Sequence, residues 1–479
     1  MNYKAILYTL GWVLNIEAAA MLLPVVCSAI YGERLCITVF FVCIAVCLLC
    51  GVILTCRPPK NKTIYAKEGF IIVALSWVMI SIFGALPFVI SGHIPNFWGA
   101  LFETASGFTT TGASVVADIE AFPRGLVFWR SFTHWIGGMG VLVFLVAILP
   151  SSGGSNLYLI KAESPGPSVS KLVPKVKSTA KILYIMYLVL TLIEIVLLLL
   201  GGVGLFDALT LSFGTAGTGG FAVKNSGLAD YSSYVQVVIT VFMLLFGVDF
   251  SVYYLLIMGR LSDALRSDEV RAYFGIVAAA IIVICFNCRG LFENIFVALK
   301  HSAFQVASII TTTGYSTTDF DKWPELSKAI LVILMFVGAC AGSTGGGMKV
   351  SRILILLKTI AKEIRIAAHP KTTLKVSMNG RPVEHETIRS INVFLAAYLV
   401  IFVASALLIS IDNHDFQTNF TAVASTLNNI GPGLGGVGPV RNFSIYSNFS
   451  LLVMTLDMLI GRLEIFPILI LFSPYTWKK

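Results

Sequence analysis

Long uninterrupted apolar runs are the feature that most limits what this chain can fold into. About 20 apolar residues are enough for a helix to cross a bilayer, and runs of that length recur from one end of the 479-residue chain to the other. Only 12% of the residues are charged, whereas soluble proteins have about 25%. The runs are too long for the alternating strands of a membrane β-barrel. We therefore predict an all-α polytopic membrane protein.

Four Thr/Gly-rich loops divide most of the chain into similar units. The loops are 109–114, 217–221, 311–316 and 428–433, and each follows an apolar segment too short to cross a bilayer. A spanning run precedes each short segment, and another follows each loop. Internal duplication of this kind is typical of membrane transport proteins. We predict four repeats of the form span, pore helix, filter loop and span, arranged with pseudo-symmetry around a central pore.

The predicted pore repeats cover 69–150, 181–259, 271–366 and 387–472, and residues 1–58 form a two-span addition before them. The expected short helices are 97–108, 205–214, 293–310 and 416–427. The ten expected spans are 5–30, 36–56, 69–91, 125–149, 182–202, 235–258, 272–289, a broken run from 329 to about 365, 388–410 and 447–471.

The charge distribution predicts the topology. Basic residues gather in the loops 57–67, 161–181, 260–271 and 349–389 and at Lys478 and Lys479, on the side opposite the Thr/Gly loops. Positive charge marks the cytoplasmic side of membrane proteins. We therefore expect both termini to be cytoplasmic and the four loops to open from outside. The net charge of +9 has the same explanation, so we expect membrane lipid and no nucleic acid as a partner.

The chemistry of the loops predicts a cation pathway. Non-helical backbone at membrane depth is tolerated only where it is buried in protein or lines water, and potassium channels use four such loops to replace the ion's hydration shell with carbonyl oxygens. Glycine permits the positive φ that aims successive carbonyls at one axis. A short helix that ends at the loop directs its negative end at the same axis. The alternative, four simple turns, does not explain why the loops recur in register.

We take one glycine in each loop as equivalent, namely Gly112, Gly219, Gly314 and Gly431. The candidate filter residues are Thr110, Thr111, Gly112, Thr218, Gly219, Gly220, Thr312, Thr313, Gly314, Tyr315, Asn429, Ile430 and Gly431. One shared glycine in each loop implies fewer tight ion sites than a full channel signature in every subunit. We expect selectivity among monovalent cations that is looser than that of such channels.

A glycine-rich break between Gly338 and Gly347 interrupts the run that begins at 329. Gly and Ser disfavour helix, so we interpret the break as a flexible intramembrane loop that lies under the filter and acts as a gate. The alternative is a glycine-faced packing contact between helices. The candidate gating residues are Gly342, Ser343, Thr344, Gly345, Gly346, Gly347, Lys349 and Arg462.

Arg462 is in the gating set because it lies inside the last spanning run. A charge at that depth is costly and marks a functional hypothesis, here an electrostatic barrier or a gate latch. The alternative is a structural pair with Asp457 or Glu464. We interpret His134 as structural, and Gly137 to Gly140 as a second weak point that packing explains equally well.

These motifs together resemble the Trk/Ktr/HKT superfamily of potassium transporters, and within it the TrkH/TrkG branch. The matching stretches are TTTGAS at 109–114, AGTGGF at 216–221, TTTGYS at 311–316, NNIGPG at 428–433, GSTGGGMK at 342–349 and GRLEIFP at 461–467. The resemblance implies potassium uptake across a bacterial inner membrane, gating by the 338–348 loop with Arg462, a homodimer and separate cytoplasmic nucleotide-binding TrkA-type subunits. It places potassium at Thr111, Gly112, Thr218, Gly219, Thr313, Gly314, Ile430 and Gly431, with no organic cofactor in this chain.

Two other functions compete with potassium uptake through a gated filter. The first is a sodium- or proton-coupled potassium symporter. The second, from another class, is a polytopic membrane enzyme, which needs acids or histidines that converge at one membrane depth. The six histidines are scattered along the chain, so we expect a transporter and not an enzyme.

Overall fold

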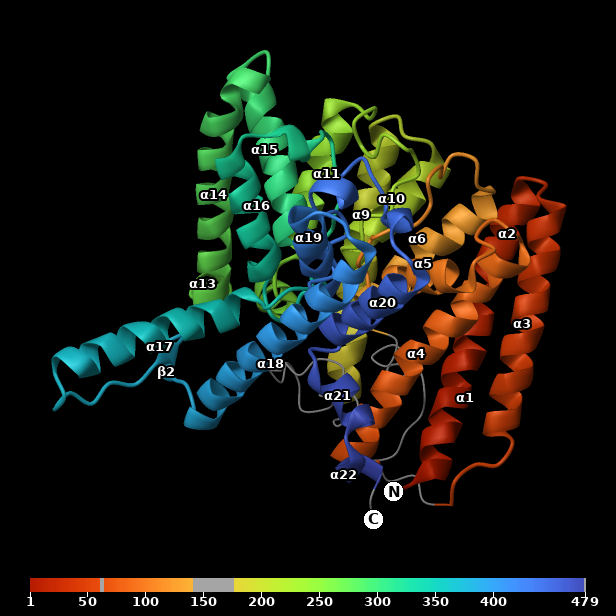
Figure 1. Ribbon diagram of the computed structural model, residues 1–479, viewed down its shortest axis with the longest axis horizontal. Coiled ribbons are helices and arrows are strands. Elements are labelled where there is room, and N and C mark those ends of the chain that lie inside the picture. The colour runs from red at the N-terminus through yellow and green to blue at the C-terminus, as the bar shows by residue number, and fades with distance from the viewer. Residues whose placement is uncertain (61–63, 141–175, 478–479) are drawn as a thin grey trace.

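The computed structural model describes residues 1–60, 64–140 and 176–477. Within these ranges the chain is mostly helical, with one short hairpin (Figure 1). Six helices are long and apolar enough to cross a membrane, or seven if one bent pair counts as a single span. The protein is therefore a multi-pass membrane protein, and the ten-span layout stays a prediction. Residues 141–149, 161–175, Lys62, Lys478 and Lys479 lie outside the described ranges.

The first helices lie together at one side of the molecule, red to orange in Figure 1. They are α1 (Tyr3–Ala20), α2 (Leu22–Ile30), α3 (Arg34–Thr55), α4 (Ala66–Ile90), α5 (Phe97–Phe108) and α6 (Arg124–Gly138). The short helix predicted at 97–108 is α5. A span is predicted at 125–149, and within its described part the helix α6 ends at Gly138. The backbone there packs closely against α5, because a Cβ on Gly137 would lie 1.8 Å from the carbonyl oxygen of Phe108.

The second group, yellow to green, comprises α9 (Val176–Leu200), α10 (Leu205–Gly217), α11 (Ser233–Phe246), α12 (Phe250–Ile257) and α13 (Leu261–Leu265). The span predicted at 235–258 is bent, because α11 and α12 meet at an angle of 92°. Asp249 starts a new helix at the bend, since its side chain accepts a hydrogen bond from the Ser251 N–H at 2.9 Å. The Gly247 carbonyl, freed from helical bonding, accepts from the Cys340 N–H at 3.0 Å.

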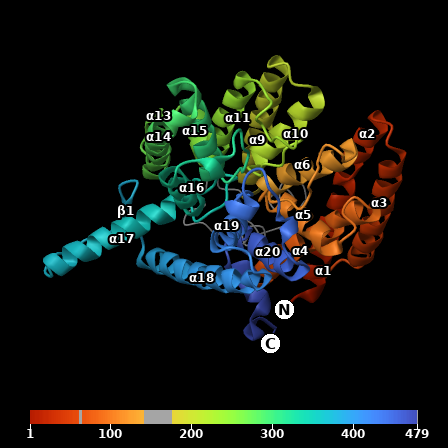
Figure 2. The same ribbon diagram turned by 45° about the horizontal axis from the view of Figure 1, so that its top comes forward.

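The third group contains α14 (Asp268–Cys288), α15 (Ile295–Ile310), α16 (Glu325–Val337) and α17 (Val350–Ala368). The helix stops at Val337 and resumes at Val350, as the glycine-rich sequence predicts, and residues 338–349 are called the intramembrane loop below. A two-stranded antiparallel hairpin, β1 (Ser377–Met378) and β2 (Arg381–Pro382), follows α17. Figures 1 and 2 both show α17 projecting away from the body of the molecule.

The last group, blue, comprises α18 (His385–Ile409), α19 (Phe416–Leu427), α20 (Asn448–Arg462), α21 (Phe466–Phe472) and α22 (Pro474–Trp477). The span predicted at 447–471 is likewise interrupted, between α20 and α21. Glu464 and Ile465 have φ values of 55° and 72°, which a helix cannot accommodate. The Glu464 carboxylate turns away to pair with Arg352 of α17, and the Ile465 side chain is buried.

The helix groups follow one another around a centre, as the colour order in Figure 2 shows. Single 3-10 turns occur at Arg289–Leu291, Phe320–Lys322, Ser410–Asp412, Gly435–Val437 and Phe443–Ile445. Near the centre, the short helices α5, α10, α15 and α19 are almost fully buried in their C-terminal halves. Their ends carry the Thr/Gly loops, so the fold brings the four loops together.

Candidate functional site

The four short helices end in the same backbone turn. In each case an N–H bonds to a carbonyl five residues earlier: Thr111 to Ser106 at 2.9 Å, Gly219 to Gly214 at 2.8 Å, Thr313 to Ser308 at 2.8 Å and Ile430 to Ser425 at 2.9 Å. The residue before each donor is left-handed, with φ of 56° at Thr110, 56° at Thr218, 57° at Thr312 and 57° at Asn429. This is the Schellman arrangement, whose left-handed position is usually glycine. Threonine at positive φ is strained, and such strain concentrates at functional sites.

The next glycine in each loop also has positive φ and touches a neighbouring loop. A Cβ on Gly112 would lie 1.9 Å from the Gly219 oxygen, one on Gly220 1.9 Å from the Thr313 oxygen, one on Gly314 2.0 Å from the Ile430 oxygen, and one on Gly431 2.8 Å from the Thr111 oxygen. Each glycine thus meets the carbonyl of the following loop, and the last meets the first. The four loops form a closed ring with backbone oxygens at every junction, and a side chain at any of these glycines would push two loops apart.

The ring corrects the register that the sequence predicts for the second loop. Gly220, with φ of 78°, occupies the position of Gly112, Gly314 and Gly431. Gly219, which the sequence predicts to be equivalent to them, instead occupies the position of Thr111, Thr313 and Ile430. The physical reason is His134, because a Cβ on Gly219 would lie 2.3 Å from its ring. Glycine at 219 therefore makes room for a histidine, and the sequence alone could not distinguish the two adjacent glycines.

His134 is fully buried and holds two loops at once. Its Nδ1 lies 2.8 Å from the Gly107 carbonyl oxygen, and its Nε2 accepts from the Phe221 N–H at 3.3 Å. These contacts fit the structural interpretation of His134, whereas its position against the ring was not predicted. A lone histidine in an apolar run gives no signal of which loop it supports.

The fourth loop differs in its side chains although its backbone turn is the same. Asn429 donates from Nδ2 to the Thr111 hydroxyl at 3.0 Å and to the Met458 carbonyl at 2.9 Å, so it bridges to the first loop. Ile430 is fully buried and has no polar side-chain atom. The Gly431 carbonyl accepts from the Ser425 hydroxyl at 2.5 Å. This quarter of the ring therefore lacks the side-chain hydroxyl that Thr111 and Thr313 supply at the equivalent position.

Tyr315 is a predicted filter residue whose side chain points away from the ring. Its hydroxyl donates to the Leu211 carbonyl of α10 at 3.0 Å, and its own carbonyl accepts from the Ser308 hydroxyl at 2.6 Å. The side chain is fully buried. Tyr315 therefore anchors the third loop to the second short helix.

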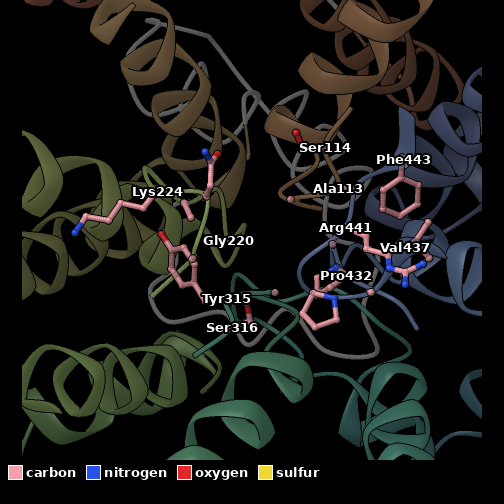
Figure 3. Close-up of a pocket in the computed structure, with 18 residues that line it drawn as sticks. Ala113, Ser114, Gly220, Lys224, Tyr315, Ser316, Pro432, Val437, Arg441 and Phe443 are labelled. Carbon is pink, nitrogen blue, oxygen red and sulfur yellow. The ribbon is translucent and has the colours of Figure 1, made fainter. Parts of the chain in front are cut away.

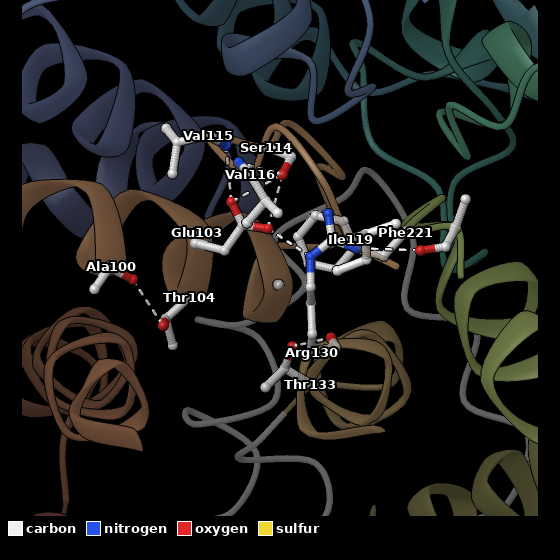
Figure 4. Close-up of polar contacts among 12 residues, drawn as sticks. Ala100, Glu103, Thr104, Ser114, Val115, Val116, Ile119, Arg130, Thr133 and Phe221 are labelled. Atoms are coloured by element: carbon white, nitrogen blue, oxygen red, sulfur yellow. Dashed lines mark hydrogen bonds and ion pairs between the residues drawn. The ribbon is translucent and has the colours of Figure 1, made fainter. Parts of the chain in front are cut away.

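A buried ion pair between α5 and α6 contacts the first and second Thr/Gly loops (Figure 4). Arg130 of α6 and Glu103 of α5 meet at 2.5 Å, and both side chains are almost completely buried. Glu103 also accepts from the Ser114 hydroxyl at 3.0 Å and from the Val115 N–H at 2.9 Å. The Arg130 guanidinium lies 3.5 Å from the centre of the Phe221 ring. Sequence reasoning missed this pair, although a charge in a short apolar helix and another in a span are a usable signal.

A cavity of about 130 Å³ lies beside the ring (Figure 3). All four positive-φ glycines line it, together with polar residues of the following connectors and two basic side chains, Lys224 and Arg441. In Figure 3 the residues that line the cavity come from differently coloured parts of the chain. The ring therefore opens to this cavity on the side of the residues that follow the loops.

The intramembrane loop contacts the opposite side, where the short helices end. The Gly346 N–H donates to the Thr312 hydroxyl at 2.6 Å, and the Gly347 N–H to the Asn428 carbonyl at 3.1 Å. The Thr344 hydroxyl donates to the Phe246 carbonyl at 3.2 Å. A Cβ on Gly346 would lie 2.4 Å from the Asn428 oxygen, so part of the glycine content serves close packing.

Two basic residues of the predicted gating set touch this loop. Lys349 donates from Nζ to the Gly345 carbonyl and is buried. Arg462, the last residue of α20, donates to the Thr344 carbonyl at 2.9 Å, to the Gly138 carbonyl at 2.9 Å and to the Thr110 hydroxyl at 3.3 Å. Arg462 thus joins the intramembrane loop, the end of α6 and the first Thr/Gly loop. The two acids of the alternative interpretation have other partners: Glu464 pairs with Arg352, and Asp457 accepts from the Ser405 hydroxyl at 2.6 Å.

Comparisons with known proteins agree along the whole chain. The profile of a family described as "TrkH: Cation transport protein" matches residues 36–479. The Trk system potassium uptake protein TrkH of Salmonella typhimurium is 34% identical over 491 residues, which cover 100% of both chains. TrkG of Escherichia coli strain K12, also named as a Trk system potassium uptake protein, is 33% identical over 100% of this chain and 99% of its own. The crystal structure of the potassium transporter TrkH from Vibrio parahaemolyticus matches with a TM-score of 0.89 at 32% identity, with both chains fully covered.

Proposed function

Because the chain belongs to the TrkH family of cation transport proteins, we propose that it takes up potassium through a carbonyl-lined filter built from the four Thr/Gly loops. The members to which it is similar are named as potassium uptake proteins. The family consists of transporters, so the alternative of a membrane enzyme is wrong. Potassium is the transported ion and therefore the cargo of the site, and no resident cofactor is needed.

One observation carries the filter proposal, the closed ring of glycine-to-carbonyl contacts. A cation that sheds water needs oxygen atoms at fixed positions to replace its hydration shell. The four junctions place backbone oxygens around one centre, and the C-terminal ends of α5, α10, α15 and α19 add partial negative charge there. With the register of the second loop corrected, the candidate potassium ligands are Thr111, Gly112, Gly219, Gly220, Thr313, Gly314, Ile430 and Gly431. Thr218 is no longer among them, because it occupies the left-handed position that precedes the ligands in each loop. The Gly431 carbonyl already accepts a hydrogen bond from Ser425. This supports a selectivity among monovalent cations that is looser than four identical loops would give.

The intramembrane loop is the proposed gate. It bonds to Thr312 and Asn428 at the inner ends of the filter loops, where a loop can block the pathway. Arg462 holds it through Thr344 and adds positive charge that repels a cation. Deleting 342–346, or changing Arg462→Ala, is expected to raise potassium flux without abolishing selectivity; unchanged flux in both variants contradicts the gate.

The remaining layout is proposed on the same basis. Ten spans, four pore repeats and a two-span addition at 1–58 are consistent with the four equivalent turns and with broken helices at 247–249, 338–349 and 463–465. The basic loops support cytoplasmic termini and a bacterial inner membrane. A homodimer and separate cytoplasmic TrkA-type nucleotide-binding subunits complete the proposal as the family resemblance implies.

Rubidium uptake tests the proposed function. In a bacterium that lacks potassium uptake, the wild-type chain is expected to restore growth on low potassium and rubidium accumulation, and Gly314→Asp is expected to abolish both while the protein still reaches the membrane. Full uptake by Gly314→Asp contradicts the filter. The coupled-symporter alternative predicts that uptake depends on an opposing or accompanying sodium or proton gradient, which the same cells can test by changing external sodium and pH.

A further inference from the structure

A single carboxylate oxygen binds the intramembrane loop at Ala341 and the start of the helix that follows it at Ser351. Glu269 is the second residue of α14, and its Oε1 accepts from the Ala341 N–H at 2.7 Å and from the Ser351 N–H at 3.0 Å. Ala341 directly precedes the run from Gly342 to Gly347, and Ser351 lies in the first turn of α17. The carboxylate therefore closes the segment that contains most of the candidate gating residues.

The physical chemistry of this contact makes it a strong fixing point. The first N–H groups of a helix have no partner within the helix, and a negative charge there is stabilised by the helix dipole. Hydrogen bonds from backbone N–H groups to a carboxylate are about twice as strong as neutral ones. Glu269 thus supplies the N-terminus of α17 with a charged acceptor that comes from a different helix.

The residue beside Glu269 binds the projecting part of the molecule. Asp268 accepts at Oδ2 from Lys358 Nζ of α17 at 3.1 Å and from the Asn379 N–H at 3.0 Å, and its own N–H donates to Asn379 Oδ1 at 2.7 Å. Asn379 lies in the turn between β1 and β2. We call residues 350–382, which comprise α17 and the hairpin, the arm.

We propose that Glu269 is the positioning residue that latches the intramembrane loop in its place beneath the filter, and that Asp268 couples this latch to the arm. The inference rests on the proposed gating role of the loop. Because Ser351 belongs to the arm and Asp268 is adjacent to Glu269, a displacement of the arm acts on both acids at once: it pulls on Asp268 through Lys358 and Asn379, and it draws Ser351 away from the carboxylate that also holds Ala341. The arm, which projects from the body in Figures 1 and 2, is then the input and the loop the output of one switch.

Cys340 provides a readout that reports loop position directly. It lies in the intramembrane loop and is fully buried. In a full-length chain that keeps Cys340 and has its other cysteines replaced, with rubidium uptake checked, the rate of modification by a small water-soluble methanethiosulfonate is measured. Glu269→Ala is expected to raise that rate roughly tenfold or more, because two charge-assisted hydrogen bonds are lost. Glu269→Gln keeps an oxygen acceptor and is expected to fall between Glu269→Ala and the wild type.

The controls separate this inference from the proposed gate. Glu363→Ala, on the exposed surface of α17, is expected to leave Cys340 modification at the wild-type rate. If Cys340 in Glu269→Ala is modified at the wild-type rate, the latch is wrong. This conclusion does not depend on whether deletion of 342–346 raises potassium flux. If that deletion leaves flux unchanged while Glu269→Ala exposes Cys340, the gate fails and the latch on the loop stands.

A double substitution tests the coupling between the two acids. Asp268→Asn is expected to raise Cys340 modification less than Glu269→Ala does, because it acts through the first turn of α14. Asp268→Asn added to Glu269→Ala is expected to cause no further increase, since residues that act through one contact are not additive. Fully additive effects, or no effect of Asp268→Asn alone, overturn the coupling to the arm.

Discussion

Gly314 lies so close to the following loop that a Cβ placed on it would be 2.0 Å from the Ile430 carbonyl oxygen. The two residues are far apart in the sequence and belong to different Thr/Gly loops. Three equivalent approaches close the ring, so the position of each loop depends on the absence of a side chain in its neighbour. The predictions below follow from this dependence and from the contacts that support it.

Gly314→Ala is expected to reduce rubidium uptake about tenfold or more. The added methyl overlaps the Ile430 oxygen, and a φ of 84° costs alanine about 1–3 kcal/mol; each 1.4 kcal/mol is about tenfold. The matched control is Gly275→Ala, because a Cβ on Gly275 meets no atom within 4 Å. Uptake measured in cells at equal membrane expression checks this, and equal loss in both variants would contradict it.

The corrected register of the second loop predicts that a second substitution can restore uptake to a Gly219 variant but not to a Gly220 variant. Gly219→Ala is expected to lower uptake because its methyl meets the His134 ring, and His134→Ala is expected to restore part of the loss by opening space. Gly220→Ala is expected to gain nothing from His134→Ala, because its methyl meets the Thr313 carbonyl. Rubidium uptake of the two double variants decides the matter, and rescue of Gly220→Ala would show that the register is wrong.

Removal of one partner of the buried Glu103–Arg130 pair is expected to destabilise the folded protein, because the other partner is left buried without its counter-charge. Glu103→Gln leaves the Arg130 charge buried and is expected to destabilise the protein by about 3–5 kcal/mol. The exposed carboxylate of Glu325, which pairs with Lys328, serves as the control, since Glu325→Gln is expected to change stability by about 0–1 kcal/mol. Thermal unfolding of purified protein in detergent measures both, and similar shifts would argue against the buried pair as a support of the loops.

Arg462→Lys is expected to resemble Arg462→Ala in raising flux. The planar guanidinium of Arg462 donates hydrogen bonds to Thr344, Gly138 and Thr110 at once. The ammonium group of lysine cannot reproduce this arrangement of donors. The potassium-to-sodium ratio of uptake is expected to stay near the wild-type value, because Arg462 binds beneath the ring. Tracer flux into proteoliposomes checks this, and wild-type flux in Arg462→Lys would mean that charge alone is sufficient.

Asp415 makes the start of α19 sensitive to acid. The Thr418 hydroxyl, followed by the Thr418 N–H, holds the pKa of the Asp415 carboxyl below its usual range. A lowered folded pKa means that the stabilisation is present above the unfolded pKa of about 3.9 and is lost as pH falls through the folded pKa. Asp415→Asn is expected to flatten the decrease in thermal stability below about pH 4, and an unchanged pH profile would contradict this.

Helix positions were predictable because they depend mainly on local apolar length. The helices expected at 97–108 and 416–427 are α5 (Phe97–Phe108) and α19 (Phe416–Leu427), with the expected bounds. The intramembrane loop was visible for a similar reason, since its glycines disfavour helix wherever they lie.

The broken helices near 248 and 464 and the register of the second loop were not predictable, because tertiary contacts decide them. The bend near 248 depends on the Cys340 N–H, which donates to the Gly247 carbonyl, and Glu464 looks like an ordinary polar residue of an apolar run until Arg352 is placed beside it. The choice between Gly219 and Gly220 depends on the His134 ring, which is distant in sequence. Glu103, Arg130 and Glu269 escaped notice because an isolated charge shows no partner until the fold supplies one.

The reversal potential of the purified, reconstituted protein tests the central claim most directly. With potassium on one side of the bilayer and an equal concentration of sodium on the other, the wild-type protein is expected to reverse well away from zero, in the direction set by a higher permeability to potassium, and Gly220→Ala is expected to conduct poorly and to reverse closer to zero. A wild-type reversal potential at zero, or a Gly220→Ala protein with wild-type current and reversal potential, would contradict a potassium filter built from the ring of four loops.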